Sequence, residues 1–164
     1  MIEYIDIVDG EDRVIGRATR EEIYQKLLPH RIVHVLIFND KGEMALQLRS
    51  DKVSFCPNHW STTVGGHVQA GESYRRAVER ECQEELGAKS KLEKFSKVFF
   101  EPKTAPKKFL MIYKTVHNGP FYPETDDVTK IDFFSIDKIQ KMVREGEKFH
   151  PELLFILEKY FLVI

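Results

Sequence analysis

The residues most suited to chemistry in this chain are three closely spaced glutamates, Glu81, Glu84 and Glu85. They lie in a run of good helix formers between Ser73, a candidate N-cap, and Gly87, a candidate C-terminal glycine. Because an α-helix returns to nearly the same side after three or four residues, the three carboxylates share one face and repel one another. An all-oxygen set suits Mg²⁺ or Mn²⁺ better than Zn²⁺, so this face is a candidate metal site, with a solvated charged face as the alternative.

These glutamates belong to a longer pattern. The stretch from position 66 to position 88 reads GHVQAGESYRRAVERECQEELGA. It resembles the Nudix box, in which a glycine, a glutamate, an Arg-Glu pair, a Glu-Glu pair and a second glycine recur at fixed spacing. The matching residues are Gly66, Glu72, Arg80, Glu81, Cys82, Glu84, Glu85, Gly87 and Ala88. All charged and glycine positions match, whereas Cys82 and Ala88 are small residues at positions that are usually aliphatic.

The resemblance to Nudix hydrolases implies a role for each acidic residue. Glu81, Glu84 and Glu85 are implied to bind a divalent metal, Mg²⁺ or Mn²⁺, and Glu81 also to orient or deprotonate the attacking water. Gly65, which precedes the first glycine, is implied to lend its carbonyl group to the metal. The implied substrate is a nucleoside diphosphate linked to a further group, with water attacking phosphorus. Since carboxylates alone would repel a diphosphate, a metal is needed to bridge them.

Five further residues are candidates for supporting roles. The resemblance implies that Arg80 holds a carboxylate in place and that Glu72 pins the loop to the helix. His67 is a candidate for contact with phosphate, and a loop histidine bonded to backbone is the alternative. Arg49 is a weaker candidate for phosphate contact. Glu124 lies in a loop that supplies another acid near the metal in many Nudix enzymes, although solvated turn acids are the default.

A second resemblance covers positions 29–72. This segment is similar to type I isopentenyl-diphosphate isomerases, as is the N-terminal hairpin. Those isomerases use a cysteine as acid/base where this chain has Gly65, and no acid stands at 107–109, where their later glutamates fall. His30 and His67 match isomerase metal histidines. Because glycine cannot protonate an alkene, the resemblance implies a hydrolase of the isomerase-like branch, with isomerase activity or a non-catalytic diphosphate-binding domain as alternatives.

Composition and charge exclude several other classes of protein. Hydrophobic residues make up 42% and charged residues 31% of the 164 residues, as is ordinary for a globular protein. The net charge of -1 gives no basic bias toward nucleic acid, and no apolar run approaches the length of a membrane span. The N-terminus lacks the pattern of a signal peptide, and two cysteines are too few for a disulfide framework. We therefore expect a cytoplasmic monomer or homodimer with a small-molecule diphosphate substrate.

The hydrophobic pattern predicts one α/β (α+β) domain over 1–164, in which 1–28 is an extension made of a hairpin and a short helix. The predicted strands are 3–8, 13–16, 31–38, 43–49, 92–100, 108–116 and 130–134, and the predicted helices are 20–28, 73–87, 136–145 and 151–161. Residues 50–61 are expected to form a loop, with Trp60 packed in the core. The family resemblance implies a mixed β-sheet sandwiched between helices, the Nudix fold, over 29–164.

Overall fold

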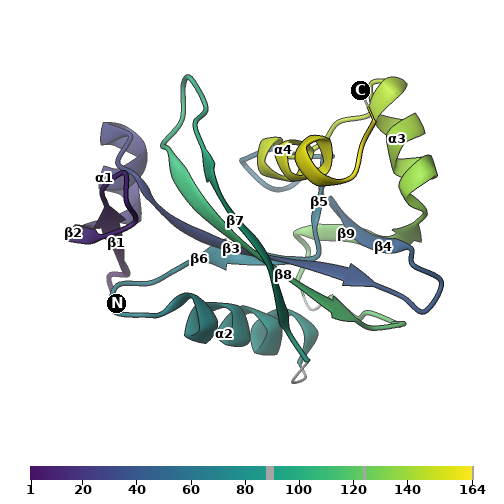
Figure 1. Ribbon diagram of the computed structural model, residues 1–164, viewed down its shortest axis with the longest axis horizontal. Helices are drawn as coiled ribbons and strands as arrows, with labels where there is room; N and C mark the ends of the chain where they lie inside the picture. The colour runs from purple at the N-terminus through teal and green to yellow at the C-terminus, as the bar shows by residue number, and fades with distance from the viewer. Residues whose placement is uncertain (88–90, 124, 164) are drawn as a thin grey trace.

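The computed structural model describes residues 1–87, 91–123 and 125–163 (Figure 1). In chain order the elements are β1 (Tyr4–Val8), β2 (Val14–Thr19), α1 (Arg20–Lys26), β3 (His30–Phe38), β4 (Met44–Arg49), β5 (Trp60–Thr62), β6 (Val64–His67), α2 (Tyr74–Leu86), β7 (Glu93–Phe100), β8 (Lys108–Val116), β9 (Val128–Phe134), α3 (Ile136–Arg144) and α4 (Pro151–Tyr160). No helix in these ranges is long and apolar enough to cross a membrane.

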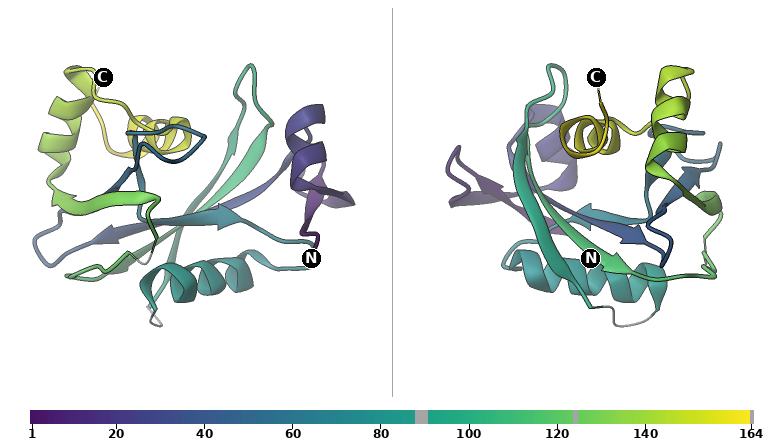
Figure 2. Two further views of the ribbon diagram at one scale, coloured as in Figure 1. Left: turned by 180° about the vertical axis from the view of Figure 1, so that it is seen from behind. Right: turned by 45° about the vertical axis from the view of Figure 1, so that its right-hand side comes forward.

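A mixed sheet of seven strands forms the centre of the molecule. Its main path runs β5-β4-β3-β8-β7, with β6 paired to β3 and β9 paired to β4. The β3–β8 pair is parallel, and the other pairs are antiparallel. Helix α2 covers one face of this sheet, and α3 and α4 cover the other (Figures 1 and 2). The predicted mixed sheet between helices is confirmed.

The central strand β3 supplies side chains to the cores on both faces of the sheet. Val33, Val35 and Ile37 are buried in the core under α2, whereas Ile32 and Leu36 are buried in the core under α3 and α4. This alternation is the two-residue period of a strand whose two faces are both covered. Each fully buried side chain of this kind contributes roughly 1.5–3 kcal/mol, so β3 helps to hold both helical layers on one sheet.

One edge of β3 is shared by two strands, and this division shapes the site. β4 pairs with β3 only where Phe38 meets Met44. β6 takes over farther along the strand, from Ile32 opposite His67 to Val35 opposite Val64. Because β4 leaves β3 to pair with β5 and β9, the sheet divides beside β6. Gly65 and Gly66 of β6 therefore lie at the division.

The N-terminal extension forms a two-stranded sheet and a short helix, as predicted. β1 and β2 are antiparallel, and α1 follows β2 directly, with the Thr19 side chain accepting a hydrogen bond at its N-terminus. Ile5, Ala18 and Ile23 form a small core of their own. The Gly71 N–H donates to Asp6 at 2.9 Å, which ties the extension to the loop before α2.

Two boundaries near the box differ from the sequence prediction. β5 lies partly inside the predicted loop 50–61, because Trp60 turns inward and is only 7% exposed in the core against α3 and α4. β6 extends through both glycines to His67, because their backbone groups pair with β3. The prediction that Trp60 packs in the core is confirmed.

Candidate active-site cleft

Helix α2 presents the predicted acidic residues as the sequence pattern indicated. Its N-cap is Ser73, whose side chain accepts a hydrogen bond from Arg76, and its C-cap is Gly87 with a positive φ of 67°. Ala77 and Cys82 are buried against the sheet. Glu81, four residues after Ala77, lies on the same side of the helix and borders a cleft of about 850 Å³. We call the three carboxylates of α2 that line the cleft the acidic face: Glu81, Glu84 and Glu85.

Arg80 is the centre of a charged network on this side of the cleft. It donates to both carboxylate oxygens of Glu72, at 2.9 and 2.8 Å, and to Glu81 at 2.8 Å. It also donates to the backbone carbonyl of His67 at 3.0 Å and lies 3.5 Å from a Glu84 oxygen. The bonds to Glu72 and Glu81 raise the pKa of Arg80, so the guanidinium stays charged and holds α2 against β6.

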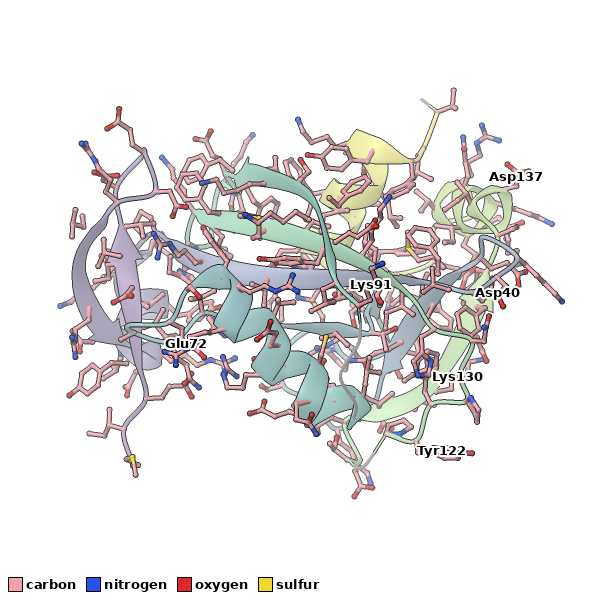
Figure 3. The ribbon with its side chains drawn as sticks, turned by 60° about the horizontal axis from the view of Figure 1, so that its bottom comes forward. Asp40, Glu72, Lys91, Tyr122, Lys130 and Asp137 are labelled. Atoms are coloured by element: carbon pink, nitrogen blue, oxygen red, sulfur yellow. The ribbon has the colours of Figure 1, made fainter. Side chains whose placement is uncertain are left out.

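Glu72 links the loop before α2 to the helix. Its carboxylate accepts the N–H of Gln69 at 2.8 Å as well as the two bonds from Arg80. Figure 3 shows Glu72 beside α2, at the end of the helix that faces the N-terminal hairpin. Although burial favours its protonated form, the bonds from Arg80 and Gln69 outweigh this and lower the pKa of Glu72. Glu72 is thus an ionised clamp between loop and helix.

The two glycines of β6 bring the acidic face close to the sheet. A Cβ atom at Gly66 would lie 2.2 Å from a carboxylate oxygen of Glu81, so only glycine leaves room for that side chain. The Gly65 N–H donates to Glu85 at 3.3 Å. The glycine before the box and the first glycine of the box are therefore in contact with two of the three acidic residues.

The acidic face is electrostatically unfavourable without a cation. Desolvation raises the pKa of Glu81, and Glu84 adds to this, against the opposing bond from Arg80. Glu85 is exposed as a residue, but its carboxyl group lies in the cleft against Gly65. Desolvation there, and then the charge of Glu81, raise its pKa to about 8. A group of like charges with raised pKa values is typical of a functional site.

The residues present fit a divalent cation that prefers oxygen. Glu81, Glu84 and Glu85 offer only oxygen donors, and the raised pKa values of Glu81 and Glu85 show that positive charge there would be stabilising. Within the described ranges, no three ligating side chains are gathered closely enough to hold a metal as they stand. The reason is that Arg80 draws Glu81 and Glu84 to itself. Glu84, whose side chain is 59% exposed, is free to turn away from Arg80.

A buried polar network on the cleft floor is the main feature that sequence reasoning missed. We call it the floor network: Thr62, His34, Glu152 and Lys108. His34 lies 2.7 Å from the Thr62 hydroxyl and 2.9 Å from one oxygen of Glu152, whose other oxygen accepts from Lys108 at 2.8 Å. Burial opposes both charges, but His34 and then Lys108 outweigh it and lower the pKa of Glu152, while Glu152 raises the pKa of Lys108. All four line the cleft.

His67 makes a different contact from those considered in the sequence. Its Nε2 lies 2.9 Å from the hydroxyl of Tyr24 on α1, and its ring stacks on His30 with centroids 5.4 Å apart. Burial, the largest cause, lowers the pKa of His30 to about 4 and that of His67 to about 3, so both rings are neutral. Lys108, the residue opposite His30 in the sheet, further disfavours their protonation.

Two residues that the sequence suggested for the site remain to be placed, Arg49 and Glu124. Arg49 lines the cleft, but its guanidinium donates twice to the carbonyl oxygen of Phe55, at 3.1 and 2.8 Å. Glu124 lies outside the described residues. Lys108 and Glu152 left only weak signals in the sequence: a lysine at the start of an apolar strand, and a glutamate after a proline that opens a helix. Only the fold brings them together.

Comparison with known proteins agrees with this geometry. A family model described as the NUDIX domain matches residues 28–154. The chain belongs to the Nudix family. Nudix hydrolases are enzymes that act on pyrophosphates and generally use divalent metal ions.

Relatives and solved structures extend the match to the N-terminus. The chain is 30% identical over 153 residues to the uncharacterised Nudix hydrolase YfcD of Escherichia coli K12. The aligned region covers 93% of this chain and 83% of YfcD. The crystal structure of DR0079 from Deinococcus radiodurans superimposes with a TM-score of 0.82 at 23% identity, over 98% of this chain and 100% of that one. The NUDIX domain of Shewanella oneidensis NrtR, described as complexed with ADP ribose, gives a TM-score of 0.59 at 15% identity, over 79% and 84% of the two chains.

Proposed function

We propose that this protein is a Mg²⁺-dependent pyrophosphohydrolase, which cleaves a phosphoanhydride bond in a nucleoside diphosphate derivative by attack of water on phosphorus. The observation that carries the proposal is the fit between Gly66 and Glu81. A strand glycine without a side chain admits a buried carboxylate, which Arg80 fixes beside two further acids. This arrangement is costly for stability and serves a purpose once a cation joins the acids to a diphosphate.

The roles follow from position. Glu81, Glu84 and Glu85, with the carbonyl of Gly65, would hold Mg²⁺, with Mn²⁺ as a substitute. When bound there, the ion neutralises the phosphoanhydride and lowers the pKa of a water molecule. Glu81 is the proposed group for orienting or deprotonating that water, because Arg80 fixes its carboxylate. Glu72 and Arg80 keep the loop and the helix in register.

Two alternatives from the sequence fit this cleft less well. An isomerase would need an acid where the chain has Gly65, and Lys108 lies in the segment where the isomerase resemblance implies acidic metal ligands. We therefore propose a hydrolase of the isomerase-like branch. A non-catalytic diphosphate-binding domain would not need three mutually repelling acids at the cleft wall.

Two broader expectations accompany the function. We propose that residues 1–164 act as one Nudix domain, with 1–28 as an extension that contributes to the cleft. We also propose a reducing, cytoplasmic setting, since Cys56 and Cys82 are both free thiols in the structure.

A substrate panel with Mg²⁺ tests the proposal directly. Nucleoside di- and triphosphates, nucleotide sugars, ADP-ribose, dinucleotides and prenyl diphosphates are incubated with the protein, and release of phosphate or mononucleotide is measured. We expect turnover of at least one nucleoside diphosphate derivative, lost on removal of Mg²⁺ with a chelator. In the variants Glu84→Gln and Glu85→Gln, the rate should fall by roughly two orders of magnitude or more, because charge stabilisation is lost.

The matched control is Glu79→Gln on the same helix, since Glu79 pairs with Arg75 and does not line the cleft. It should retain the parent rate. Circular dichroism checks that all variants keep the fold. Hydrolysis at the parent rate by both Glu84→Gln and Glu85→Gln would show that the metal assignment is wrong.

A further inference from the structure

Helix α1 forms a wall of the cleft that lies outside the matched Nudix region. Three residues of α1 and its C-cap line the cleft: Arg20, Tyr24 and Leu27. The family model begins only at residue 28. Figure 1 shows α1 beside the start of β3, at the end of the sheet away from α3. Whatever this wall recognises is therefore added by the N-terminal extension to the cleft of the matched domain.

The wall stands at some distance from the acidic face. Along β3, His34 pairs with Gly65, whereas Tyr24 packs edge-on against His30, with ring centroids 5.7 Å apart. The four residue steps from His34 to His30 span roughly 13 Å of extended strand, and from α1 the Tyr24 hydroxyl reaches back only as far as His67, 2.9 Å from its Nε2. A substrate whose diphosphate lies at Gly65 must therefore extend beyond the diphosphate to reach α1.

Lys108 provides a fixed positive charge below this wall. Its side chain is only 8% exposed, its Nζ atom is bonded to Glu152 at 2.8 Å, and it lies 5.4 Å from the centre of the Tyr24 ring. A buried ion pair is seldom retained for stability alone, because desolvation offsets most of the attraction. An ammonium group has three N–H donors, and the bond to Glu152 uses one. The Tyr24 hydroxyl takes a second donor, so one remains for a ligand in the cleft.

Arg20 provides a second positive charge, on the rim. It is exposed, and among the described residues no carboxylate lies within 4.0 Å of its guanidinium group. Arg80, by contrast, is saturated by Glu72 and Glu81. Glu3 lines the same rim without forming such a pair. Among the described residues, the positive charge at this end that no carboxylate pairs thus comes from Arg20, whereas Lys108, paired with Glu152, offers a hydrogen-bond donor.

We propose that Arg20 and Tyr24 of α1, together with Lys108, form a subsite for a second anionic group of the substrate, carried by the part of the molecule beyond the diphosphate. The inference rests on the proposed function, because it takes the acidic face as the place where the diphosphate binds. A carboxylate and a phosphate share the chemistry that Arg and Lys recognise, so the test includes one pair of compounds for each.

The test compares substrates that differ by one anionic group. UDP-glucuronate and UDP-glucose differ by a carboxylate, and NADP and NAD differ by a phosphate. In one of the two pairs, we expect the compound with the extra anionic group to have a kcat/KM roughly tenfold higher than its partner. A factor of this size corresponds to one charge-assisted contact. Arg20→Gln should reduce this ratio to about one with little effect on the neutral member. Arg20→Lys should restore part of it.

Arg17→Gln is the matched control, because Arg17 is exposed on β2 and does not line the cleft. Arg20 is exposed, so its substitution should leave folding intact, whereas Lys108→Met serves as a second variant that is interpreted only if thermal unfolding remains cooperative. A wild-type ratio near one for both pairs would overturn the subsite. So would an equal loss for charged and neutral members in Arg20→Gln.

Binding measurements separate this inference from the proposed function. If the wild-type protein hydrolyses none of the four compounds, calorimetric titration with each pair in the presence of Mg²⁺ still tests the subsite. Tighter binding of a charged member, lost in Arg20→Gln, would support the subsite without hydrolysis. Equal binding of both members would refute it, whatever the hydrolysis results show.

Discussion

The acidic face and the floor network are both charged regions of one cleft, but they are built in opposite ways. Glu81, Glu84 and Glu85 lie within two turns of α2 and carry like charges. The floor network joins Thr62 and His34 to Glu152 and Lys108, from four separate elements, and its charges are opposite and paired. The acidic face therefore requires an added cation, whereas the floor network is already neutralised.

The difference shows which kind of site can be read from a linear pattern. A helix brings residues at spacings of three and four together by itself, so the acidic face follows from local geometry. The floor network depends on β8 lying parallel beside β3 and on α4 starting over the same end of the cleft. Substitutions at Glu152 and at Gly66 test whether the two regions differ in this way.

The largest expected effect is the loss of the buried charge on the floor. Glu152→Gln should leave the ammonium of Lys108 buried without its counter-charge, and should lower the free energy of unfolding by about 3 kcal/mol. Urea denaturation measures the change. Glu158→Gln, an exposed position on the same helix, is the control and should change stability by less than about 0.5 kcal/mol. Equal effects of the two variants would mean that packing, not the ion pair, holds the floor.

The next prediction concerns the acidic face. Gly66→Ala would place a methyl group 2.2 Å from the Glu81 carboxylate, so that side chain must move away from its position between Arg80 and the cleft. We expect hydrolysis of the best substrate to fall about a hundredfold, since misplacement of a catalytic group by about 1 Å has effects of this size. Steady-state kinetics measures the loss.

Gly16→Ala is the control for this substitution, because a Cβ atom there would have no neighbour within 4 Å. It should retain the parent rate. If Gly66→Ala were as active as Gly16→Ala, the position of Glu81 would not matter for the reaction.

The last prediction concerns the pH dependence of stability. Buried His30 and His150 have pKa values lowered to about 4, below the ordinary value of 6.5, so the unfolded chain binds protons that the folded chain does not. Stability should therefore fall as the pH decreases from about 6.5 to 4, by at most about 1.4 kcal/mol per pH unit for each histidine. Glu85, with a raised pKa, contributes in the opposite direction, because its stabilising protonation is lost as the pH rises through about 8.

Urea denaturation at pH 7.5 and pH 4.5 measures this dependence. The variant His30→Gln removes one of the titrating groups and should reduce the loss of stability between the two pH values. His59→Gln, in the loop after β4, should leave the loss unchanged. An undiminished loss in His30→Gln would show that this ring is not the group held neutral by burial.

Much of the architecture was predictable from the sequence. The predicted strand over 31–38 and the caps of α2 at Ser73 and Gly87 rest on local signals, and the structure agrees with them. The prediction failed near Trp60 and His67, where β5 and β6 form. These strands are short and contain glycine or polar residues, so only their pairing with β4 and β3 makes them strands.

Spacing within a single turn-and-helix segment is enough to specify the acidic face, its glycine neighbours and the helix that carries them. The groups that stand opposite are brought there by long-range contacts. Lys108 reaches Glu152 across 44 positions of the chain, and His34 reaches the same carboxylate across 118. Such contacts depend on the pairing of β3 with β8 and on the docking of α4, which no local pattern in the chain encodes.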